Sequence, residues 1–384
     1  MPSNPIHSSN TSGTGGEPAL PAGCRRACPG CAHRALSAAH SEARKQDFLA
    51  ARLAPWADRL APLLAPPAAA RLGYRDRATL SAEWRDGAWR LGLMRRDEVI
   101  AIPDCPVHTP RLRAAVRLLA RHLPPPDGFP LAFVAFSGGQ GTLVLKTAQP
   151  PALDWLDDAL QARLAAIGLD GLWLHLHPSA GKKIFHKRGW LLAWGRGESR
   201  DAQGLWHGPS GFAQLIPSLY EASRQAAGDW LQVRSGDALL DLYCGNGGTL
   251  RRWLAAGAQS IGVELGGEAI DFARRNAPGA ELLRGCCATR LPQLDAWLGA
   301  RGDARRLVYA NPPRGGLEPQ VCDWLVERCR AERLALLSCS AGTLARDLMA
   351  LEAGGYRVER LLPYDFFPRT LHVEVLALLR RDAR

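Results

Sequence analysis

The sequence predicts an α/β protein, with a Rossmann-like domain in its C-terminal half, preceded by an N-terminal cysteine cluster and a central α+β domain. Three observations indicate the Rossmann-like part. Apolar runs with the length of buried strands recur in the C-terminal half, at DALLDL, SIGVEL, RRLVYA and LALLS. A glycine-rich turn follows the first run, and helix-like stretches separate the runs. Strands that alternate with helices in this way are typical of a mostly parallel sheet covered by helices.

Composition and turn signals divide the chain into four parts. Residues 1–22 are rich in Ser, Gly and Pro and are expected to be disordered, whereas residues 23–65 contain a cysteine cluster and a helix. Residues 66–205 form the central α+β domain, and residues 206–384 form the Rossmann-like domain.

The elements expected in the first half of the chain follow from periodicity and turn residues. A stretch rich in Ala, Leu and Arg predicts a helix over residues 38–64, and residues 110–121 predict another. Asp86-Gly87 and residues 138–141 predict hairpin turns between short strands. An amphipathic pattern predicts a further helix over residues 151–169. Two more strands are expected at LWLHLH and IFHKRGWLLAW.

The glycine-rich turn after DALLDL has the features of a nucleotide-binding loop. It reads YCGNGG and leads into a helix-like stretch, so that backbone N–H groups can approach a ligand at the helix N-terminus. The next strand ends in Glu264, where a carboxylate can hydrogen-bond a ribose diol. No Walker lysine and no third spaced glycine are present, which favours S-adenosylmethionine over ATP or NAD. The residues expected to bind this cofactor here are Asp241, Tyr243, Gly245, Gly247 and Glu264.

Reactive side chains follow the remaining strands of the same domain. RRLVYA is followed by Asn311, and LALLS is followed by Cys339, which is either a nucleophile or a small core residue. Glu374 lies near the start of LHVEVLALLRR. If this last strand runs antiparallel, its start lies at the same edge of the sheet as the ends of the others. Asp241, Glu264, Asn311, Cys339 and Glu374 would then share one rim, with a nucleophile and a base beside a cofactor pocket.

At these residues the chain resembles the RNA uridine C5-methyltransferase family, whose members make 5-methyluridine in ribosomal or transfer RNA. The resemblance spans roughly residues 205–384 and covers DLYCGNGG, NPPRGG, LLSCSAGTLARDL and FFPRTLHVEVLALLRR. It implies a class I S-adenosylmethionine-dependent methyltransferase domain, with Cys339 as nucleophile, Glu374 as base and Asn311 beside the cofactor. The segment FAQL resembles the family's FxQ element, which places Gln214 in the active site. Phe212 is either a stacking surface for the base or a core residue.

The chemistry implied by this resemblance explains the residue types. The C5 carbon of uracil is a weak nucleophile, so a thiolate first adds at C6 and produces an enolate that can take up the methyl group. A base then removes the C5 proton, and the thiolate leaves. The thiolate must be populated, so we expect a depressed pKa for Cys339 from cationic or helix-terminal surroundings. The target uridine must be flipped out or already unpaired.

Three positions depart from the family pattern. Asn311 stands where the family usually has Asp, Ser340-Ala341 where it has Asn-Pro, and Cys286-Cys287 where an acid near the adenine is expected. Neither the nucleophile nor the base is lost. The departures nevertheless leave open an RNA-binding scaffold of the same fold without activity. A small-molecule or protein methyltransferase is disfavoured, because methyl transfer to nitrogen or oxygen does not need the Cys/Glu pair.

A cluster of cysteines precedes the central domain. Cys24-x3-Cys28-x2-Cys31, with Cys105 further along, provides four soft ligands for an iron–sulfur cluster or zinc. The family resemblance favours a 4Fe–4S cluster, although the first gap is shorter than the family's, and a site without metal remains open. CxxxCxxC is also the radical-SAM motif, but no strand precedes it, no repeated βα pattern follows, and Cys105 would close the open iron position.

Bulk properties agree with an RNA enzyme. The net charge is +11 and the pI is near 9.5, which suits a polyanionic partner, and residues 177–189 concentrate basic side chains that could contact the RNA backbone. No apolar run of transmembrane length and no signal-peptide core are present. We therefore expect a cytoplasmic monomer with reduced thiols and no membrane partner. Because no separate barrel precedes the cysteines, we expect 23S ribosomal RNA as the substrate, with transfer RNA as the alternative, and a central domain that positions RNA.

Overall fold

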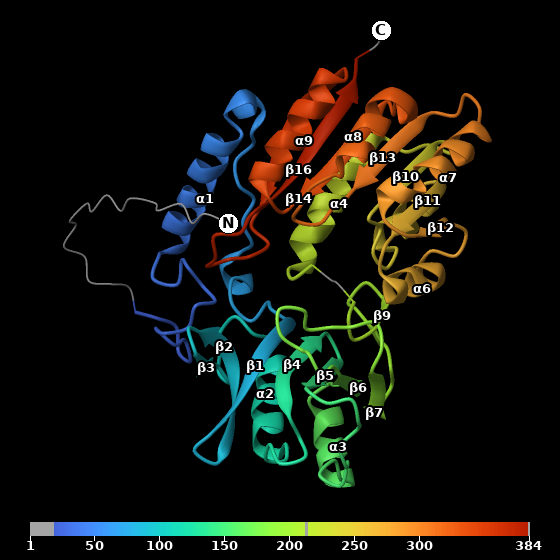
Figure 1. The fold of residues 1–384 in the computed structure, drawn as a ribbon. Coiled ribbons are helices and arrows are strands. Elements are labelled where there is room, and N and C mark those ends of the chain that lie inside the picture. Colours follow the sequence, from blue (N-terminus) through green and yellow to red (C-terminus); the bar gives the residue numbers. More distant parts are fainter. Residues whose placement is uncertain (1–18, 212–213, 383–384) are drawn as a thin grey trace, which may run out of the picture.

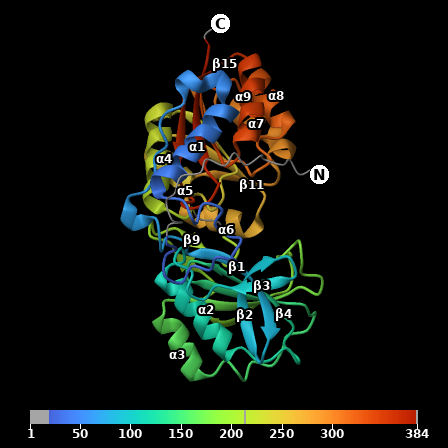
Figure 2. The same cartoon turned by 90° about the vertical axis from the view of Figure 1, so that its left-hand side faces the viewer.

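The computed structural model describes residues 19–211 and 214–382, which fold around two seven-stranded sheets. Each sheet lies in its own lobe, and the lobe of the C-terminal sheet is stacked on that of the central sheet (Figures 1 and 2). A short ribbon of β8 (Ser199–Arg200) and β9 (Trp206–His207) lies where the chain passes from one lobe to the other.

The C-terminal sheet has the strand order β12-β11-β10-β13-β14-β16-β15, and its first five strands are parallel. This architecture confirms the predicted α/β, Rossmann-like fold class. The strands are β10 (Ala238–Leu242), β11 (Gln259–Glu264), β12 (Glu281–Arg284), β13 (Arg306–Ala310), β14 (Arg333–Ser338), β15 (Tyr356–Tyr364) and β16 (Glu374–Arg381). The helices are α4 (Pro217–Leu231), α5 (Gly248–Ala255), α6 (Gly267–Asn276), α7 (Cys287–Gly299), α8 (Pro319–Trp324), a π turn η3 (Leu325–Cys329) and α9 (Ala341–Ala353).

The last strand runs antiparallel to β14, as predicted. The register pairs Ser338 with Val375, so the end of β14 lies beside the start of β16. Cys339 follows the first of these positions and Glu374 precedes the second. The reversal of a single strand therefore brings together two side chains that are far apart in the sequence.

The central sheet has the order β3-β2-β1-β4-β5-β6-β7 and is mostly antiparallel. The predicted hairpin at Asp86-Gly87 is confirmed, and both residues have positive φ angles (53° and 74°), as a type I′ turn requires. The hairpin at residues 138–141 is confirmed as well. The elements are β1 (Arg77–Arg85), β2 (Ala88–Arg95), β3 (Glu98–Ala101), α2 (Pro110–His122), β4 (Leu131–Ser137), β5 (Gln140–Leu145), α3 (Asp158–Ala166), β6 (Gly171–Leu176) and β7 (Trp190–Gly195).

Two predicted helices are shorter than expected. The helix predicted over residues 38–64 ends at Arg52 as α1 (Ala38–Arg52), because Pro55 cannot continue its hydrogen bonding, and a 3-10 segment η1 (Ala54–Arg59) follows. Residues 60–64 then run parallel to β15, through bridges of Leu60 and Leu64. The helix predicted over residues 151–169 is limited to α3. Asp157 caps the N-terminus of α3, where its side chain accepts a hydrogen bond from the Leu160 N–H at 2.8 Å. A further 3-10 turn, η2 (Ala68–Ala70), precedes the central sheet.

The segment that follows the cysteines packs on the C-terminal sheet. Leu49 of α1, Leu53 at the C-cap of this helix and Trp56 of η1 belong to the same buried cluster as β14, β16 and α9. Figure 2 shows α1 lying over the C-terminal lobe beside α9. The first and last parts of the described chain therefore share one hydrophobic core.

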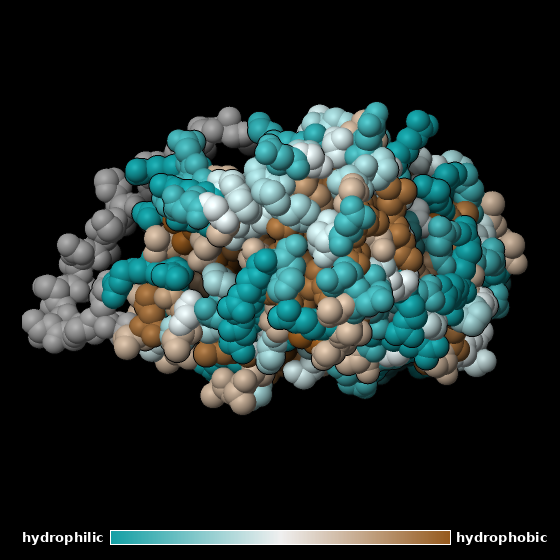
Figure 3. Space-filling model, turned by 90° about the horizontal axis from the view of Figure 1, so that it is seen from below, coloured by the Kyte–Doolittle hydropathy of each residue, from teal (hydrophilic) through white to brown (hydrophobic). Residues whose placement is uncertain are grey.

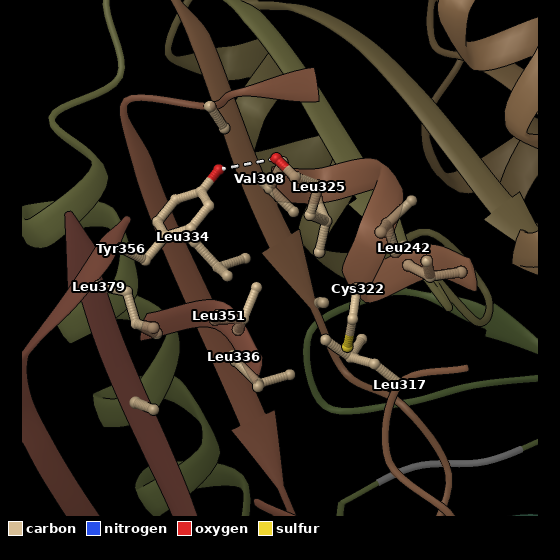
Figure 4. Packing of buried hydrophobic residues seen from close by; sticks show 14 of the residues in the cluster. Leu242, Val308, Leu317, Cys322, Leu325, Leu334, Leu336, Leu351, Tyr356 and Leu379 are labelled. Atoms are coloured by element: carbon tan, nitrogen blue, oxygen red, sulfur yellow. Dashed lines mark hydrogen bonds between the residues drawn. The ribbon is translucent and has the colours of Figure 1, made fainter. Parts of the chain in front are cut away.

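Helices cover both faces of the C-terminal sheet. One face packs against α1, α7, α8 and α9, and the other packs against α4 and α5. Figure 4 shows the first of these cores, in which the Tyr356 hydroxyl donates to the Leu325 carbonyl at 3.3 Å. Such packing fixes the strand ends, and these ends carry the candidate site.

Seen from the end that carries the central lobe, the surface is a mixture of polar and apolar patches (Figure 3). No helix among residues 19–211 and 214–382 has both the length and the apolar character needed to cross a membrane.

Candidate active site

A cavity of about 1550 Å³ opens at the C-terminal ends of the parallel strands. One wall comes from loops of the C-terminal sheet, and the other comes from the central lobe, including Arg77, Ser137 and Gly138. Ligand pockets typically measure roughly 300–1000 Å³, so this cavity has room for a cofactor and a second ligand together. Strand ends of an open α/β sheet are where ligands are expected.

The glycine-rich loop and Glu264 form one end of the cavity. The carboxylate of Glu264 accepts from the N–H groups of Gly245 at 3.1 Å and Gly266 at 2.6 Å. Gly245 and Gly247 have positive φ angles of 55° and 81°. A Cβ on Gly247 would lie 3.0 Å from the Ala273 backbone, so this glycine permits close packing of the loop and does not line the cavity.

Asp241 lies beneath this loop. Its side chain is fully buried, accepts from Trp253 Nε1 at 3.0 Å, and is not part of the cavity wall. Burial raises the pKa of Asp241 to about 7, although hydrogen bonds from Thr249 and Trp253 oppose the shift. Among the residues predicted for the cofactor, Asp241 and Gly247 are therefore held behind the wall. Tyr243, Gly245, Glu264, Asn311 and Gln214 line it.

Sequence reasoning missed Glu318, a further acid in the cavity wall. The Tyr243 hydroxyl donates to its Oε2, and the Cys286 thiol donates to its Oε1 at 2.8 Å. Burial is the main reason that the pKa of Tyr243 is raised. No motif marks Glu318, which lies seven residues after Asn311 beyond a glycine pair. Only the folded chain brings it to the loops after β10 and β12.

Cys339 and Glu374 line the other end of the cavity. Glu374 is 3% exposed, and its Oε2 accepts from Gln214 Nε2 at 3.1 Å. Burial raises the pKa of Glu374 to about 7, and the Gln214 hydrogen bond opposes this shift. A carboxyl group with this pKa can exchange protons near neutral pH.

The expected depression of the Cys339 pKa is wrong for this structure. The side chain is half-buried, and burial, followed by the nearby charge of Glu374, raises the pKa of its thiol. Arg314 acts in the opposite direction through its charge and a hydrogen bond, but is outweighed. Arg314 is exposed at the cavity wall. The predicted cationic neighbour is therefore present, but the desolvation of the thiol, which raises its pKa, was not predicted.

The loop that leads to Glu374 is held by the N-terminal segment, a contact that sequence reasoning also missed. Lys45 is 1% exposed, and its Nζ lies 2.6 Å from Asp365 Oδ1 and 3.0 Å from the Phe367 carbonyl. The Arg369 guanidinium donates to the Arg34 carbonyl at 2.7 Å, and the Tyr74 hydroxyl donates to the Pro368 carbonyl at 3.0 Å. Phe367 and His372 of this loop line the cavity.

The structure does not place two further predicted features at this wall. Phe212, the candidate stacking residue, lies outside the described residues. The basic stretch 177–189 begins immediately after the C-terminal end of β6. Ser137 and Gly138, which line the cavity, lie at the opposite end of the neighbouring strands of the central sheet. A six-residue strand spans roughly 16 Å, so the stretch lies about one strand length from the cavity side.

The four N-terminal cysteines are neighbours in the structure. Burial raises the pKa of Cys31 to about 11, with further increases from the charges of Cys105 and Cys28. Burial likewise raises the pKa of Cys105, and Cys28 and Cys24 add to the shift. Within the described part of the chain, however, no group of three or more His, Cys, Asp or Glu side chains has the arrangement of a metal site.

The similarity to known proteins extends over nearly the whole chain. Residues 304–382 match the family described as tRNA (uracil-5-)-methyltransferase. The 23S rRNA (uracil(1939)-C(5))-methyltransferase RlmD of Pseudomonas fluorescens is 30% identical over 389 residues, which cover 93% of this chain and 78% of that protein. The 23S rRNA (uracil(747)-C(5))-methyltransferase RlmC of Shigella sonnei is 36% identical over 178 residues, covering 46% of this chain and 45% of that protein.

A solved structure has the same fold. The tRNA (uracil-54, C5)-methyltransferase of Pyrococcus abyssi, solved in complex with S-adenosyl-L-homocysteine, superimposes with a TM-score of 0.68 at 21% sequence identity. The alignment covers 92% of this chain and 86% of that chain. Both lobes described above are therefore included in the shared architecture.

Proposed function

Since the chain belongs to the RNA uracil-C5-methyltransferase family, we propose that it methylates the C5 carbon of a uridine in 23S ribosomal RNA through Cys339 and Glu374. S-adenosylmethionine is the methyl donor, and RNA is the substrate. The choice of 23S ribosomal RNA and the roles of individual side chains are proposed.

One observation carries the assignment of the residues. A thiol, an acid of raised pKa and an amide that donates to this acid lie in one cavity with a nucleotide-binding loop. Transfer to a carbon that needs activation requires both a nucleophile and a base, and Cys339 and Glu374 are of the right type for these roles. The presence of both a nucleophile and a base disfavours the alternative of an RNA-binding protein that has this fold but no activity.

The reaction can be followed through the residues of the chain. The Cys339 thiolate forms a bond to C6, and the electron pair of the C5–C6 double bond moves into an enolate. The C5 carbon then takes the sulfonium methyl, and S-adenosylhomocysteine is the leaving group. The carboxylate of Glu374 accepts the C5 proton, the double bond re-forms, and the sulfur of Cys339 departs as thiolate. The charge of Arg314 favours the thiolate form of Cys339, both before the attack on C6 and when the sulfur leaves.

Ribosomal RNA is favoured over transfer RNA by the relatives. The RlmD relative, which is 30% identical over 93% of this chain, acts on 23S rRNA. The RlmC relative, which is 36% identical over 46% of this chain, acts on 23S rRNA as well. Transfer RNA remains the second candidate, because the solved structure with the same fold is a transfer RNA enzyme.

Nucleoside mass spectrometry tests the reaction and its substrate together. A deletion strain is expected to lose one 5-methyluridine from its 23S rRNA, and the gene for the wild-type chain restores it. The gene carrying Cys339→Ala is expected to restore nothing, whereas the matched variant Cys322→Ala, at a buried core cysteine, restores the modification. Loss from the transfer RNA pool would favour the second candidate, and no loss from either pool would contradict the proposed activity.

We also propose that Cys24, Cys28, Cys31 and Cys105 hold an iron–sulfur cluster of the 4Fe–4S type. Four thiols are the donor set that such clusters use, and these four lie near one another. Their side chains must adjust to bind, because they do not form a metal site as they stand. The cluster would tie the N-terminal loop together and takes no part in the steps above.

Metal analysis distinguishes the possible states of these cysteines. Protein purified without oxygen is expected to contain about four iron and four sulfide ions per chain, and Cys105→Ser is expected to lose them. Zinc in place of iron would favour a zinc site formed by the same four cysteines, and a protein without either metal would contradict both.

A further inference from the structure

Glu318 is an acid in the cavity wall to which neither motif nor mechanism gives a role. Its carboxylate lies at the loops after β10 and β12, because Tyr243 and Cys286 donate to its two oxygens. Glu264, at the end of β11, lies between these two strands in the sheet order. Two carboxylates, Glu264 and Glu318, therefore lie at the same end of the cavity.

The surroundings of Glu318 suit a flat, partly apolar ligand. Leu265 follows Glu264, lines the cavity, and is 69% exposed, which is unusual for a large aliphatic side chain. Gly285, Cys286 and Cys287 line the same part of the wall. An exposed leucine and a fixed carboxylate in the wall of one cavity offer an apolar surface for a ring and an acceptor for an N–H group at the ring's edge.

The hydrogen bonding of Glu318 leaves acceptor capacity for a ligand. An ionised carboxylate has about four lone-pair sites, and the contacts from Tyr243 and Cys286 use one on each oxygen. Both contacts also fix the rotation of the carboxylate before any ligand arrives. A side chain held in this way loses little freedom when it accepts a further hydrogen bond.

We propose that Glu318 accepts a hydrogen bond from the exocyclic 6-amino group of the cofactor's adenine, while Glu264 binds the ribose. Cys286 and Tyr243 orient Glu318 for this contact and are positioning residues. The assignment rests on the proposed function, since it presupposes that this end of the cavity holds S-adenosylmethionine. It also explains how cysteine can stand at the end of β12, because an acid from the loop after β13 reaches the same place.

The contact has a consequence for ligand choice. A 6-oxo group, as in hypoxanthine, presents an oxygen to the carboxylate where adenine presents N–H. A hydrogen bond to a charged group contributes about 1.5–3 kcal/mol, so the 6-amino ligand should bind roughly 10- to 150-fold more tightly than its 6-oxo analogue.

Calorimetric titration with S-adenosylhomocysteine and S-inosylhomocysteine tests this preference. The wild-type protein is expected to prefer the adenosyl ligand by this factor. Glu318→Ala is expected to bind both ligands with similar affinity, and Glu318→Gln keeps part of the preference, because its amide oxygen can accept. Glu327→Gln, at an exposed acid outside the cavity wall, is the matched control and keeps the full preference.

Each result decides between the assignment of Glu318 and the proposed function. Equal affinities of the wild-type protein for the two ligands would overturn the role of Glu318 and leave the methyltransferase activity intact. A preference that survives in Glu318→Ala would do the same. No binding of S-adenosylhomocysteine to folded wild-type protein would overturn both. The comparison of ligands on the wild-type protein needs no variant, so a variant that fails to fold does not weaken the test.

Discussion

The two ends of the cavity are built in different ways. At the cofactor end, Glu264 accepts from Gly245, a residue only 19 positions away in the chain. At the other end, Gln214 donates to Glu374 across 160 positions, and Lys45 pairs with Asp365 across 320. The cofactor end thus joins loops of the C-terminal domain, the widest of these contacts being that of Tyr243 with Glu318 across 75 positions. The end with Cys339 depends on contacts that span more than 150 positions. We expect the second end to be more sensitive to changes elsewhere in the molecule.

The largest effect at the remote end is expected from Glu374→Gln. An amide cannot accept the C5 proton, so methyl transfer to RNA should slow by about 10²–10⁴-fold. The step before proton removal remains possible, and a covalent adduct between RNA and Cys339 should accumulate. Denaturing gel electrophoresis with labelled RNA measures this adduct. Normal turnover of this variant without an adduct would contradict the assignment of Glu374 as the base.

Lys45→Met tests whether the N-terminal segment positions the base-bearing loop. Breaking a buried ion pair costs about 3–5 kcal/mol, because Asp365 is left buried without its cation. We expect kcat on RNA to fall by up to about 100-fold, since a small displacement of reacting groups has effects of this size. Affinity for S-adenosylhomocysteine, measured by calorimetry, should stay unchanged, because Lys45 contacts Asp365 and Phe367 in the loop that leads to Glu374.

The controls for Lys45 use its neighbours. Arg44→Met changes an exposed side chain of the same helix and should leave kcat unchanged. Lys45→Met combined with Asp365→Asn removes the uncompensated charge and should recover part of the stability. An equal loss of cofactor affinity in Lys45→Met would contradict the separation between the two ends.

The raised pKa of Glu374 predicts a pH dependence of stability. Its pKa rises from the usual 4.5 to about 7 on folding, so the folded state binds more protons between these values. Stability from this group is therefore lost as the pH rises from about 4.5 to about 7, by roughly 3 kcal/mol in total. Glu374→Gln lacks this loss, so its stability relative to wild type should increase over that window and then level off.

Urea unfolding of both proteins across this pH range measures the difference. Asp241 also has a raised pKa, but it is present in both proteins and cancels in the comparison. A stability difference that does not change with pH would mean that Glu374 titrates normally in the folded protein.

The smallest effect is expected at the cofactor end, from Tyr243→Phe. This change removes one hydrogen bond to Glu318 and keeps the ring, so affinity for S-adenosylhomocysteine should fall only about 3- to 10-fold. The kcat on RNA at saturating cofactor should be unchanged. A lower kcat with unchanged cofactor affinity would show that Tyr243 serves the remote end instead.

Several features could be predicted from local sequence because their causes are local. Glycines at 245 and 247 indicate a turn with positive φ angles. The apolar runs before Glu264, Asn311 and Cys339 predict strands whose ends lie together at one cavity. The fold class and the placement of Cys339 and Glu374 in one cavity follow from these signals and the antiparallel last strand. The predicted helix over residues 38–64 is too long, because Pro55 cannot continue the helical hydrogen bonding and α1 ends at Arg52.

Features that depend on burial and on remote contacts could not be predicted in this way. Asp241 looked like a cofactor ligand, but packing against Trp253 places it behind the cavity wall. Cys339 looked like a thiol with a lowered pKa, but desolvation outweighs Arg314. Glu318, Lys45 and the loop before Glu374 carry no motif, and their roles arise only where distant segments meet. Turn and strand preferences act between near neighbours, whereas desolvation and ion pairing depend on the whole packed chain.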